Sequence, residues 1–355
     1  MEVSGLTLDL AGAERAVAEL ARRTPLLEAH GLSERLGAPV FVKAECLQVT
    51  GSFKVRGAAA RLAALTPEER TRGVVACSSG NHGRAVAYVA ERLGVPATVC
   101  VPEWVDPVKL DAIRATGAEA VLAGDTFDAA EIHALEIAAR DGRPYVSAYD
   151  DPWVIAGQGT IALEILDELD EPPAAILAPL SGGGLAGGIA AAFAHRLGEH
   201  APPVVAVSAE RAAVMLASLR AGRPVEVPEE ETLANALAGG LGPDNRHSFA
   251  LVRELIGEHV TVTEEEIARA MVYAVRSLRL VVEGGGAVGL AALLGGAWRG
   301  GGAPSAPGGA VPGGAWPAAG RAARGGAWPA AGPVVVVLSG GNVAPETLAS
   351  VLRLA

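Results

Sequence analysis

The fold is decided by the stretch Ile176-Leu177-Ala178-Pro179-Leu180-Ser181-Gly182-Gly183-Gly184-Leu185-Ala186-Gly187-Gly188. It begins with an apolar run of the length of a buried strand, and a glycine-rich turn then leads into small residues that suit a helix. A strand that passes through such a turn into a helix is typical of α/β proteins. Adjacent glycines also let backbone amides approach an anion closely, so the turn is a candidate phosphate-binding loop.

The alternation of strands and helices continues on both sides of this stretch. Other apolar, β-rich runs lie at 39–43, 74–77, 98–101, 120–122, 204–207, 260–262 and 334–338. Alanine-rich segments with helical spacing lie between them, at 83–93, 126–140, 161–169 and 264–278. The last of these opens with Thr263 and Glu266 at the spacing of a capping box. This pattern predicts parallel sheets that are covered by helices on both faces.

Composition narrows the classes of function. The chain has 355 residues, a net charge of −11 and only 29 Lys and Arg residues, whereas a nucleic-acid-binding protein needs a basic face. Its three cysteines form no CxxC motif, so we expect no disulfide framework. No apolar run approaches the roughly 20 residues of a membrane helix, and residues 1–10 carry no basic leader pattern. We therefore expect a cytoplasmic protein with neither nucleic-acid nor membrane partners.

One segment, 295–332, departs from the alternation. It is rich in Gly, Ala and Pro, and Gly-Gly-Ala-Trp begins at positions 295, 313 and 325. Such a composition cannot bury a core of its own, which predicts a flexible low-complexity insertion at the surface. The alternative is that Trp298, Trp316 and Trp328 dock onto another surface.

A lysine follows a tight turn in Thr50-Gly51-Ser52-Phe53-Lys54-Val55-Arg56-Gly57, and a helix-like run begins directly after this motif. An amine that is desolvated near a helix N-terminus has its charged form disfavoured, and only the neutral amine is nucleophilic. Lys54 is therefore a candidate Schiff-base lysine. Taken alone, a solvated lysine at the start of a helix explains the pattern more simply.

Two further turns follow predicted strands. In Ser78-Ser79-Gly80-Asn81-His82-Gly83, successive backbone N–H groups at a helix start form an anion site suited to a substrate carboxylate. An ordinary capped turn is the alternative. The motif Leu338-Ser339-Gly340-Gly341-Asn342 ends the last strand, and a hydroxyl there faces the crevice in which α/β sheets bind ligands. Taken alone, this motif is better explained by a simple strand-ending turn.

The glycines of the opening stretch allow a second interpretation. Gly182, Gly184 and Gly187 spell GxGxxG, and Glu210 follows the next predicted strand. This arrangement is also typical of a dinucleotide-binding fold. An NAD-dependent oxidoreductase that uses 182–187 is therefore an alternative function.

Together and in this order, the four motifs resemble the threonine/serine dehydratase family of fold-type II pyridoxal-5′-phosphate (PLP) enzymes. The similarity extends over 20–295 and 333–350, and includes Thr24-Pro25-Leu26, Asp150-Asp151-Pro152 and Gly157-Gln158-Gly159-Thr160. It implies a two-lobed α/β fold, similar to the tryptophan synthase β-subunit, with parallel-rich sheets flanked by helices.

The resemblance also implies how the lobes divide the chain. The large PLP-binding lobe comprises 1–73 and 151–355, with 295–332 as the insertion. The small lobe, 74–150, carries the loop for the substrate carboxylate and closes over the substrate, which excludes water. Members of the family are usually dimers or tetramers, so we expect a homodimer or homotetramer.

Each site residue receives a role from the same resemblance. Lys54 holds PLP as a Schiff base and removes the α-proton of the substrate. The other cofactor contacts come from the ring of Phe53, the side-chain amide of Asn81, the backbone amides of Gly182, Gly183, Gly184 and Leu185, and the hydroxyl of Ser339. The substrate carboxylate is bound by Ser78, Ser79, Gly80, Asn81 and His82.

Ser339 bears on the choice of reaction. The resemblance places its hydroxyl at the pyridine nitrogen, which a hydroxyl does not keep protonated as a carboxylate does, so the ring is a weaker electron sink. Elimination of a β-hydroxyl is thereby favoured over racemisation or transamination. The implied activity is α,β-elimination from a small hydroxy-amino acid, L-threonine or L-serine, which yields a 2-oxo acid and ammonia.

The chain departs from the family in three respects. Ser181 replaces the first glycine of the usual tetraglycine loop, which is tolerated if its φ is negative. The residues that match the family's cation site are Glu210, Val214 and Leu216, and a leucine supplies no carboxylate, so we expect no metal. The chain ends after the catalytic region, so we expect no C-terminal regulatory domain.

The subfamily has several alternatives. Asn81-His82-Gly83-Arg84 and Gly240-Leu241-Gly242-Pro243-Asp244-Asn245-Arg246 resemble dehydratases of hydroxyectoine utilisation, and a 3-hydroxyaspartate dehydratase is a related possibility. Ser79 stands where serine racemases carry their second acid/base, which allows racemisation. A non-catalytic PLP-binding or amino-acid-binding module of the same fold is the last alternative.

Overall fold

Two parallel sheets organise the chain in the computed structural model, which describes residues 2–3, 5–78, 80–103, 105, 107–242, 245–298 and 332–353. The large sheet has the order β10-β9-β8-β11-β4-β3, and only β3 runs antiparallel to its neighbour. Its strands are β3 (Leu26–Glu28), β4 (Val40–Lys43), β8 (Ala175–Pro179), β9 (Val204–Ala209), β10 (Glu258–Val262) and β11 (Val334–Val337). Two short strands, β1 (Glu2–Val3) and β2 (Leu6–Thr7), form a separate antiparallel pair.

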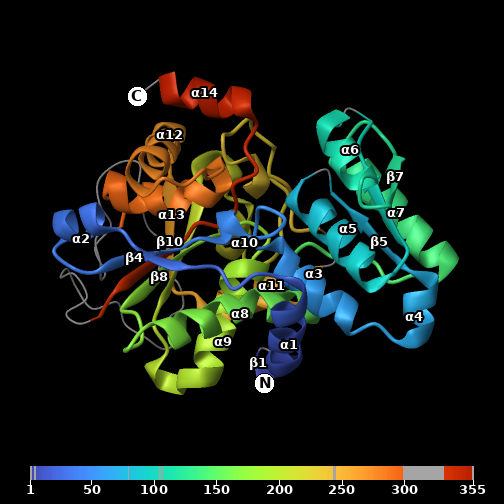
Figure 1. Ribbon diagram of the computed structural model, residues 1–355, viewed down its shortest axis with the longest axis horizontal. Coiled ribbons are helices and arrows are strands. Elements are labelled where there is room, and N and C mark those ends of the chain that lie inside the picture. The colour runs from blue at the N-terminus through green and yellow to red at the C-terminus, as the bar shows by residue number, and fades with distance from the viewer. Residues whose placement is uncertain are drawn as a thin grey trace.

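The small sheet has the order β5-β6-β7 and is parallel throughout. Its strands are β5 (Val74–Cys77), β6 (Ala97–Val101) and β7 (Glu119–Leu122), and the helices around it are α4 (Pro67–Arg72), α5 (Asn81–Leu93), α6 (Pro107–Arg114) and α7 (Phe127–Asp141). Figure 1 shows this unit at the right of the molecule, beside the large sheet and its helices. The predicted α/β fold with parallel sheets is confirmed.

Helices cover both faces of the large sheet, and the strands alternate between them as a pleated strand must. Val335 and Val337 pack toward one face, whereas Val334 and Val336 pack toward the other. The first face is covered by α1 (Leu10–Leu20), α8 (Pro152–Glu168), α9 (Gly184–Leu197), α10 (Val214–Ala221) and α11 (Ser248–Leu255). The second is covered by α2 (His30–Leu36), α12 (Glu264–Tyr273), α13 (Gly284–Gly295) and α14 (Pro345–Arg353). Because both faces of the sheet are buried, the sequences of its strands are continuous apolar runs.

Helix α3 (Lys54–Ala63) lies where the two sheets meet. It packs against α1, α5 and α8. Its residues Val55, Ala59 and Leu62 belong to the core of the small sheet, although the helix follows a strand of the large one. The lysine motif is therefore held between the two halves of the molecule.

The predicted strands are confirmed in every run, and two helices differ from expectation. Helix α8 begins at Pro152, before the predicted 161, because Asp151 caps it by accepting bonds from the amides of Trp153 and Val154, at 2.8 and 3.0 Å. Helix α12 begins with the predicted Thr263–Glu266 capping box. It ends at Tyr273, however, and a π-helical turn, Ala274–Leu278, follows and leads to Arg279 at φ 60°.

The prediction of a surface insertion is wrong at its start. Gly295 ends α13, and Trp298 is only 4% exposed, in the core between α12 and α13 and the large sheet. The first Gly-Gly-Ala-Trp copy thus ends a helix, with Gly296 at φ 73°, and supplies a core aromatic. Trp316 and Trp328 lie outside the described residues.

The structure also bears on the expectations about membrane helices and disulfides. None of the helices in the described part of the chain has both the length and the apolar character that crossing a membrane requires. No disulfide joins Cys46, Cys77 and Cys100.

Candidate active site

Three of the four motifs meet at the carboxyl ends of the parallel strands. The amide of Phe53 donates to Ser339 O at 3.0 Å, and Ser52 forms a bridge with Gly340. The side chain of Asn342 reaches Asn81, with 2.6 Å between Nδ2 and Oδ1. The lysine motif, the Ser339 turn and the start of α5 are therefore in direct contact, as their positions after strands β4, β11 and β5 predict.

Lys54 is the first residue of α3, and its Nζ atom donates to the carbonyl of Ala148 at 2.7 Å. The same atom lies 5.2 Å from the centre of the Phe53 ring. Burial lowers the pKa of Lys54 to about 8, although the carboxylate of Glu283 opposes the shift. A substantial fraction of this amine is therefore neutral and nucleophilic near physiological pH.

The glycine loop between β8 and α9 is shaped by Tyr149. A Cβ atom on Gly182 would lie 2.4 Å from Cγ of the Tyr149 ring, and one on Gly184 would lie 2.6 Å from the Tyr149 carbonyl. Gly183 has φ 88°, which a side chain would strain. No side chain caps α9, so the amides of its first turn face the loop and form an anion site of the predicted kind.

Ser181 occupies this loop without strain. Among the described residues, the only non-glycine residue with positive φ is Arg279, so the condition set for Ser181 is met. Its hydroxyl donates to Leu237 O at 2.8 Å.

The loop after β5 presents a second uncapped helix start. Gly80 precedes α5 and offers no side chain, while its amide donates to Ser78 Oγ at 3.1 Å. Ser79 lies outside the described residues, so its predicted role as an acid/base stays a prediction. The amides that open α5 belong to Asn81, His82 and Gly83, and they suit a carboxylate.

His82 is buried, and its imidazole is turned away from such a ligand. Its Nε2 atom lies 2.8 Å from Val146 O, and a carbonyl only accepts, so Nε2 carries the hydrogen and donates. Burial, and then the charge of Lys54, lower the pKa of His82 to about 3. The ring is therefore neutral, and only the backbone N–H of His82 is available to bind an anion.

Two side chains that the sequence did not single out complete the site. Glu283, which directly precedes α13, accepts a bond from Asn81 Nδ2 at 2.6 Å. Asn342 donates from Nδ2 to Thr50 O at 2.9 Å as well as to Asn81. The only signal for Asn342 was its place in the motif that ends the last strand, after Ser339-Gly340-Gly341. The only signal for Glu283 was that it directly precedes three glycines.

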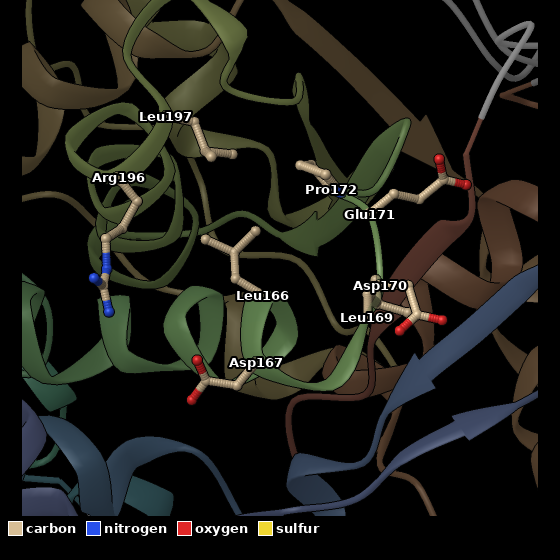
Figure 2. Close-up of a pocket in the computed structure, with 8 residues that line it drawn as sticks. All are labelled: Leu166, Asp167, Leu169, Asp170, Glu171, Pro172, Arg196 and Leu197. Atoms are coloured by element: carbon tan, nitrogen blue, oxygen red, sulfur yellow. The ribbon is translucent and has the colours of Figure 1, made fainter.

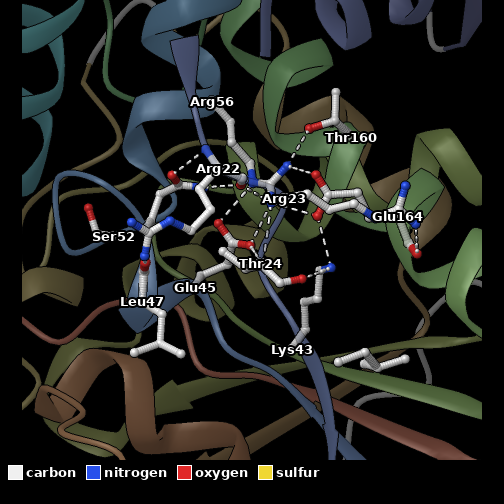
Figure 3. A network of polar contacts seen from close by, with 12 residues as sticks. Arg22, Arg23, Thr24, Lys43, Glu45, Leu47, Ser52, Arg56, Thr160 and Glu164 are labelled. Atoms are coloured by element: carbon white, nitrogen blue, oxygen red, sulfur yellow. Dashed lines mark hydrogen bonds and ion pairs between the residues drawn. The ribbon is translucent and has the colours of Figure 1, made fainter. Parts of the chain in front are cut away.

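A buried polar network around Arg56, the third residue of α3, holds the start of this helix (Figure 3). The guanidinium of Arg56 donates to Glu45 at 2.8 Å and to Glu164 at 2.6 Å. Burial disfavours the charge of Arg56, but the two carboxylates outweigh it and raise the pKa of this group. Lys43 extends the network with Nζ at 2.8 Å from Glu164.

Two hollows lie away from these motifs. A hollow of about 350 Å³ lies between the ends of α8 and α9, and Figure 2 shows Asp167, Glu171 and Arg196 around it. The other is lined by Glu210 and Leu216 beside Arg211 and Arg220. In the ranges that the structure describes, no cluster of three or more potential His, Cys, Asp or Glu metal ligands is found. The expected absence of a metal stays a prediction.

The residues fit PLP as the cofactor. The site contains an amine with a lowered pKa, a glycine loop that excludes side chains beside a free helix start, and an aromatic ring next to the amine. The hydroxyl of Ser52 is fully buried and has no hydrogen-bond partner among the described residues. This turn therefore has a polar group that is available to a ligand.

Comparison with known proteins decides the family. Residues 17–303 match the profile of the pyridoxal-phosphate dependent enzymes. The chain belongs to this family. The predicted cofactor, PLP, is confirmed, and the nicotinamide interpretation of Gly182–Gly187 is set aside.

Named relatives and solved structures agree with this family. The chain is 42% identical to a putative threonine dehydratase of Sinorhizobium fredii, over 83% of this chain and 88% of that protein. It is 45% identical to an L-threonine ammonia-lyase of Geobacter sulfurreducens, over 77% of this chain and 67% of that protein. It also resembles a threonine deaminase structure from Solanum lycopersicum, with a TM-score of 0.82 and 32% identity over 98% of this chain and 92% of that one.

Proposed function

We propose that this PLP enzyme converts L-threonine, and also L-serine, to a 2-oxo acid and ammonia by α,β-elimination. The observation that carries the proposal is Lys54, an amine with a pKa of about 8 in a chain 45% identical to an L-threonine ammonia-lyase. The reaction removes the α-proton and the β-hydroxyl, and water then releases ammonia from the resulting enamine.

Bound PLP attaches amino groups covalently and withdraws electrons from the α-carbon of the substrate. Lys54 serves as the attachment point and as the group that takes the α-proton at Nζ. Its lowered pKa supports both roles, because the amine must be neutral to attack a carbonyl and to accept a proton.

The remaining cofactor contacts surround Lys54. The amides of Gly182, Gly183, Gly184 and Leu185 bind the phosphate at the start of α9. The side-chain amide of Asn81 would donate to the ring oxygen, the ring of Phe53 would pack beside the pyridine, and the hydroxyl of Ser339 would face the pyridine nitrogen. A hydroxyl partner favours elimination, since it stabilises less charge on the ring than a carboxylate would.

The substrate carboxylate binds at the start of α5. Asn81 and His82 offer backbone amides there, and Ser78 and Ser79 offer hydroxyls, while the amide of Gly80 in the same turn donates to Ser78 Oγ. This loop follows a strand of the small sheet, within the proposed small lobe 74–150, whereas Lys54 belongs to the proposed large lobe, 1–73 and 151–355. Closure of the lobes around the substrate would exclude water from the reactive enamine.

The test combines a spectrum with a substrate panel. Purified protein mixed with PLP is expected to show a visible absorbance band that borohydride bleaches. Threonine, serine and 3-hydroxyaspartate are then scored for ammonia and 2-oxo acid release, and threonine is expected to be turned over fastest. A band without product from any of the three would identify a non-catalytic binding module. Preference for 3-hydroxyaspartate would reassign the substrate.

Racemisation is the second candidate, because the chain also resembles maize serine racemase, with a TM-score of 0.82 and 28% identity over 98% of this chain and 97% of that one. Chiral analysis of serine recovered after partial turnover measures it directly. We expect little D-serine, since the hydroxyl of Ser339 disfavours a long-lived carbanion. Oligomeric state and cytoplasmic location stay predictions, and sedimentation equilibrium tests the first.

A further inference from the structure

We propose that Asn342 is a positioning residue, which fixes the orientation of the Asn81 amide and joins helix α5 to the turn that carries Ser339. The inference rests on the proposed function, because Asn81 matters there through its contact with the cofactor. Asn342 itself lies between β11 and α14, outside every role assigned above.

The hydrogen bonds around Asn342 form a continuous chain. Arg84 Nη1 donates to Asn342 Oδ1 at 3.1 Å, and Asn342 Nδ2 donates to Asn81 Oδ1 at 2.6 Å. Asn81 Nδ2 in turn donates to Glu283 Oε1 at 2.6 Å. This series of hydrogen bonds therefore connects the cation of Arg84 to the carboxylate of Glu283 through the amides of Asn342 and Asn81. It passes from α5 to the turn after β11, and from there back to α5.

The orientations of both side-chain amides, of Asn342 and of Asn81, are determined by neighbours that can only donate or only accept hydrogen bonds. A guanidinium only donates, so Asn342 must turn its oxygen toward Arg84. The carbonyl of Thr50 only accepts, at 2.9 Å, so Asn342 must turn its nitrogen there. An ionised carboxylate at Glu283 only accepts, so Asn81 must turn its nitrogen toward Glu283 and its oxygen toward Asn342.

Packing against the lysine motif restricts the side chain of Asn342 to this position. Gly51 has φ 77°, and a Cβ atom there would lie 2.3 Å from Asn342 Oδ1. The amide of Gly341 donates to Gly51 O at 2.8 Å, which holds the two turns together. The side chain of Asn342 thus fills a space that the lysine motif keeps open with a glycine, three residues before Lys54.

One consequence concerns the second hydrogen on Asn81 Nδ2. The first is taken by Glu283, and the plane of the amide is set by Asn342. The second hydrogen therefore has a defined direction and is available to the ring oxygen of PLP. Without Asn342 the amide could rotate, and a contact that must be made in one direction would lose strength.

Asn342→Asp is the sharpest variant, because it is isosteric and keeps an acceptor for Arg84. It replaces the donor by a carboxylate oxygen that faces two acceptors, Thr50 O and Asn81 Oδ1. Flipping Asn81 gives no relief, since its own oxygen would then face Glu283. Asn342→Ala removes the donor without adding charge. Asn235→Asp repeats the charge change at an exposed asparagine and serves as the matched control.

Each apoprotein is titrated with PLP, and the position of the visible band is recorded. We expect the Kd for PLP to rise about tenfold in Asn342→Asp, the cost of one unmet, partly buried hydrogen bond, and we expect the visible band to shift. Asn342→Ala should show the same band shift with a smaller rise, while Asn235→Asp should match the wild type. If Asn342→Asp does not fold, Asn342→Ala decides.

Two results would overturn the inference. Unchanged Kd and band position in both Asn342 variants would show that Asn81 needs no such support. An equal change in Asn235→Asp would show that the added charge alone is responsible. Wild-type protein that takes up no PLP would instead overturn the proposed function, so the two failures are distinguishable.

Discussion

Lys54 and Arg56 lie near the start of the same helix, α3, and both are cations, yet Arg56 is fully buried, Lys54 is partly buried, and their surroundings differ. The guanidinium of Arg56 contacts the carboxylates of Glu45 and Glu164, whereas the amine of Lys54 donates to the neutral carbonyl of Ala148. Burial disfavours the charge in both cases. The carboxylates reverse the effect for Arg56, so its pKa rises, while the pKa of Lys54 falls to about 8.

The comparison separates a structural cation from a reactive one. Charge is kept where two carboxylates and the hydroxyl of Thr160 surround it, and this network anchors the start of α3. Charge is disfavoured two residues earlier, at Lys54, where a neutral amine is required. The anchoring network therefore allows Lys54 to stay in place although its own contacts are few.

The largest effect is expected from Lys54→Arg, which breaks the distinction between the two residues. Arginine keeps the charge but has no neutral form in this pH range, so it cannot attach the cofactor. The borohydride-sensitive band should be lost, and ammonia release from threonine should fall by about 10³-fold, the scale of a lost acid–base group. Lys54→Ala should behave alike, and retention of the band in either variant would remove Lys54 from its assigned role.

Arg56→Met tests the structural side of the comparison. The substitution leaves Glu45 buried without its cation and leaves Glu164 with Lys43 alone, which should cost about 3–5 kcal/mol of unfolding free energy. Urea unfolding of the apoprotein measures it. Arg269 pairs with Glu265 at the surface, with its side chain 55% exposed, and provides the control. Arg269→Met should change stability by less than about 0.5 kcal/mol, and equal losses in both variants would contradict the interpretation.

Features that depend on neighbouring residues in the sequence could be predicted, whereas contacts between residues far apart in the sequence could not. Strands such as Val74–Cys77 and Val334–Val337 are continuous apolar runs, so local sequence predicts them. The motifs around Lys54, Asn81 and Ser339 were also visible, because glycines beside polar residues mark strand ends. Their roles came from the family resemblance, since a lysine at a helix start has no distinguishing pattern by itself.

The partners of these residues were not predictable. Glu45 and Glu164 meet Arg56 from positions 11 and 108 residues away, and Asn342 meets Asn81 from 261 residues away. Such pairings exist only after the sheets assemble. Trp298 was misjudged for a related reason, because its composition matches the repeats that follow it, whereas its burial depends on α12 and α13.

A pH titration sharpens the comparison on the Lys54 side. The rate at which apoprotein forms the visible band with PLP should rise with pH and reach half its maximum near pH 8, because the amine is protonated below its pKa of about 8. Glu283→Gln removes a carboxylate that raises the pKa of Lys54, so the midpoint should move to lower pH. A wild-type midpoint near 10.5, the ordinary value for lysine, would show that the amine is not desolvated.

The smallest effect is expected from replacing His82, which lies near Lys54 and, like it, has a pKa that burial lowers. Its pKa falls from 6.5 to about 3 on folding, so below pH 6.5 the unfolded chain takes up a proton that the folded protein refuses. Stability should be complete above pH 6.5 and decline as the pH falls toward 3. His82→Gln keeps a donor for Val146 O but does not titrate. Unfolding free energy between pH 6 and 4 should then decline less steeply, by at most about 1.4 kcal/mol per pH unit.

The control for this measurement is His200→Gln, at an exposed histidine, which should retain the wild-type slope. Carboxylates also titrate in this interval, but they contribute alike to all three proteins and cancel in the difference. Parallel curves for wild type and His82→Gln would mean that His82 is protonated in the folded protein at pH 4. Lys54 would then have a second cation beside it, and the contrast with Arg56, whose charge is matched by carboxylates, would no longer hold.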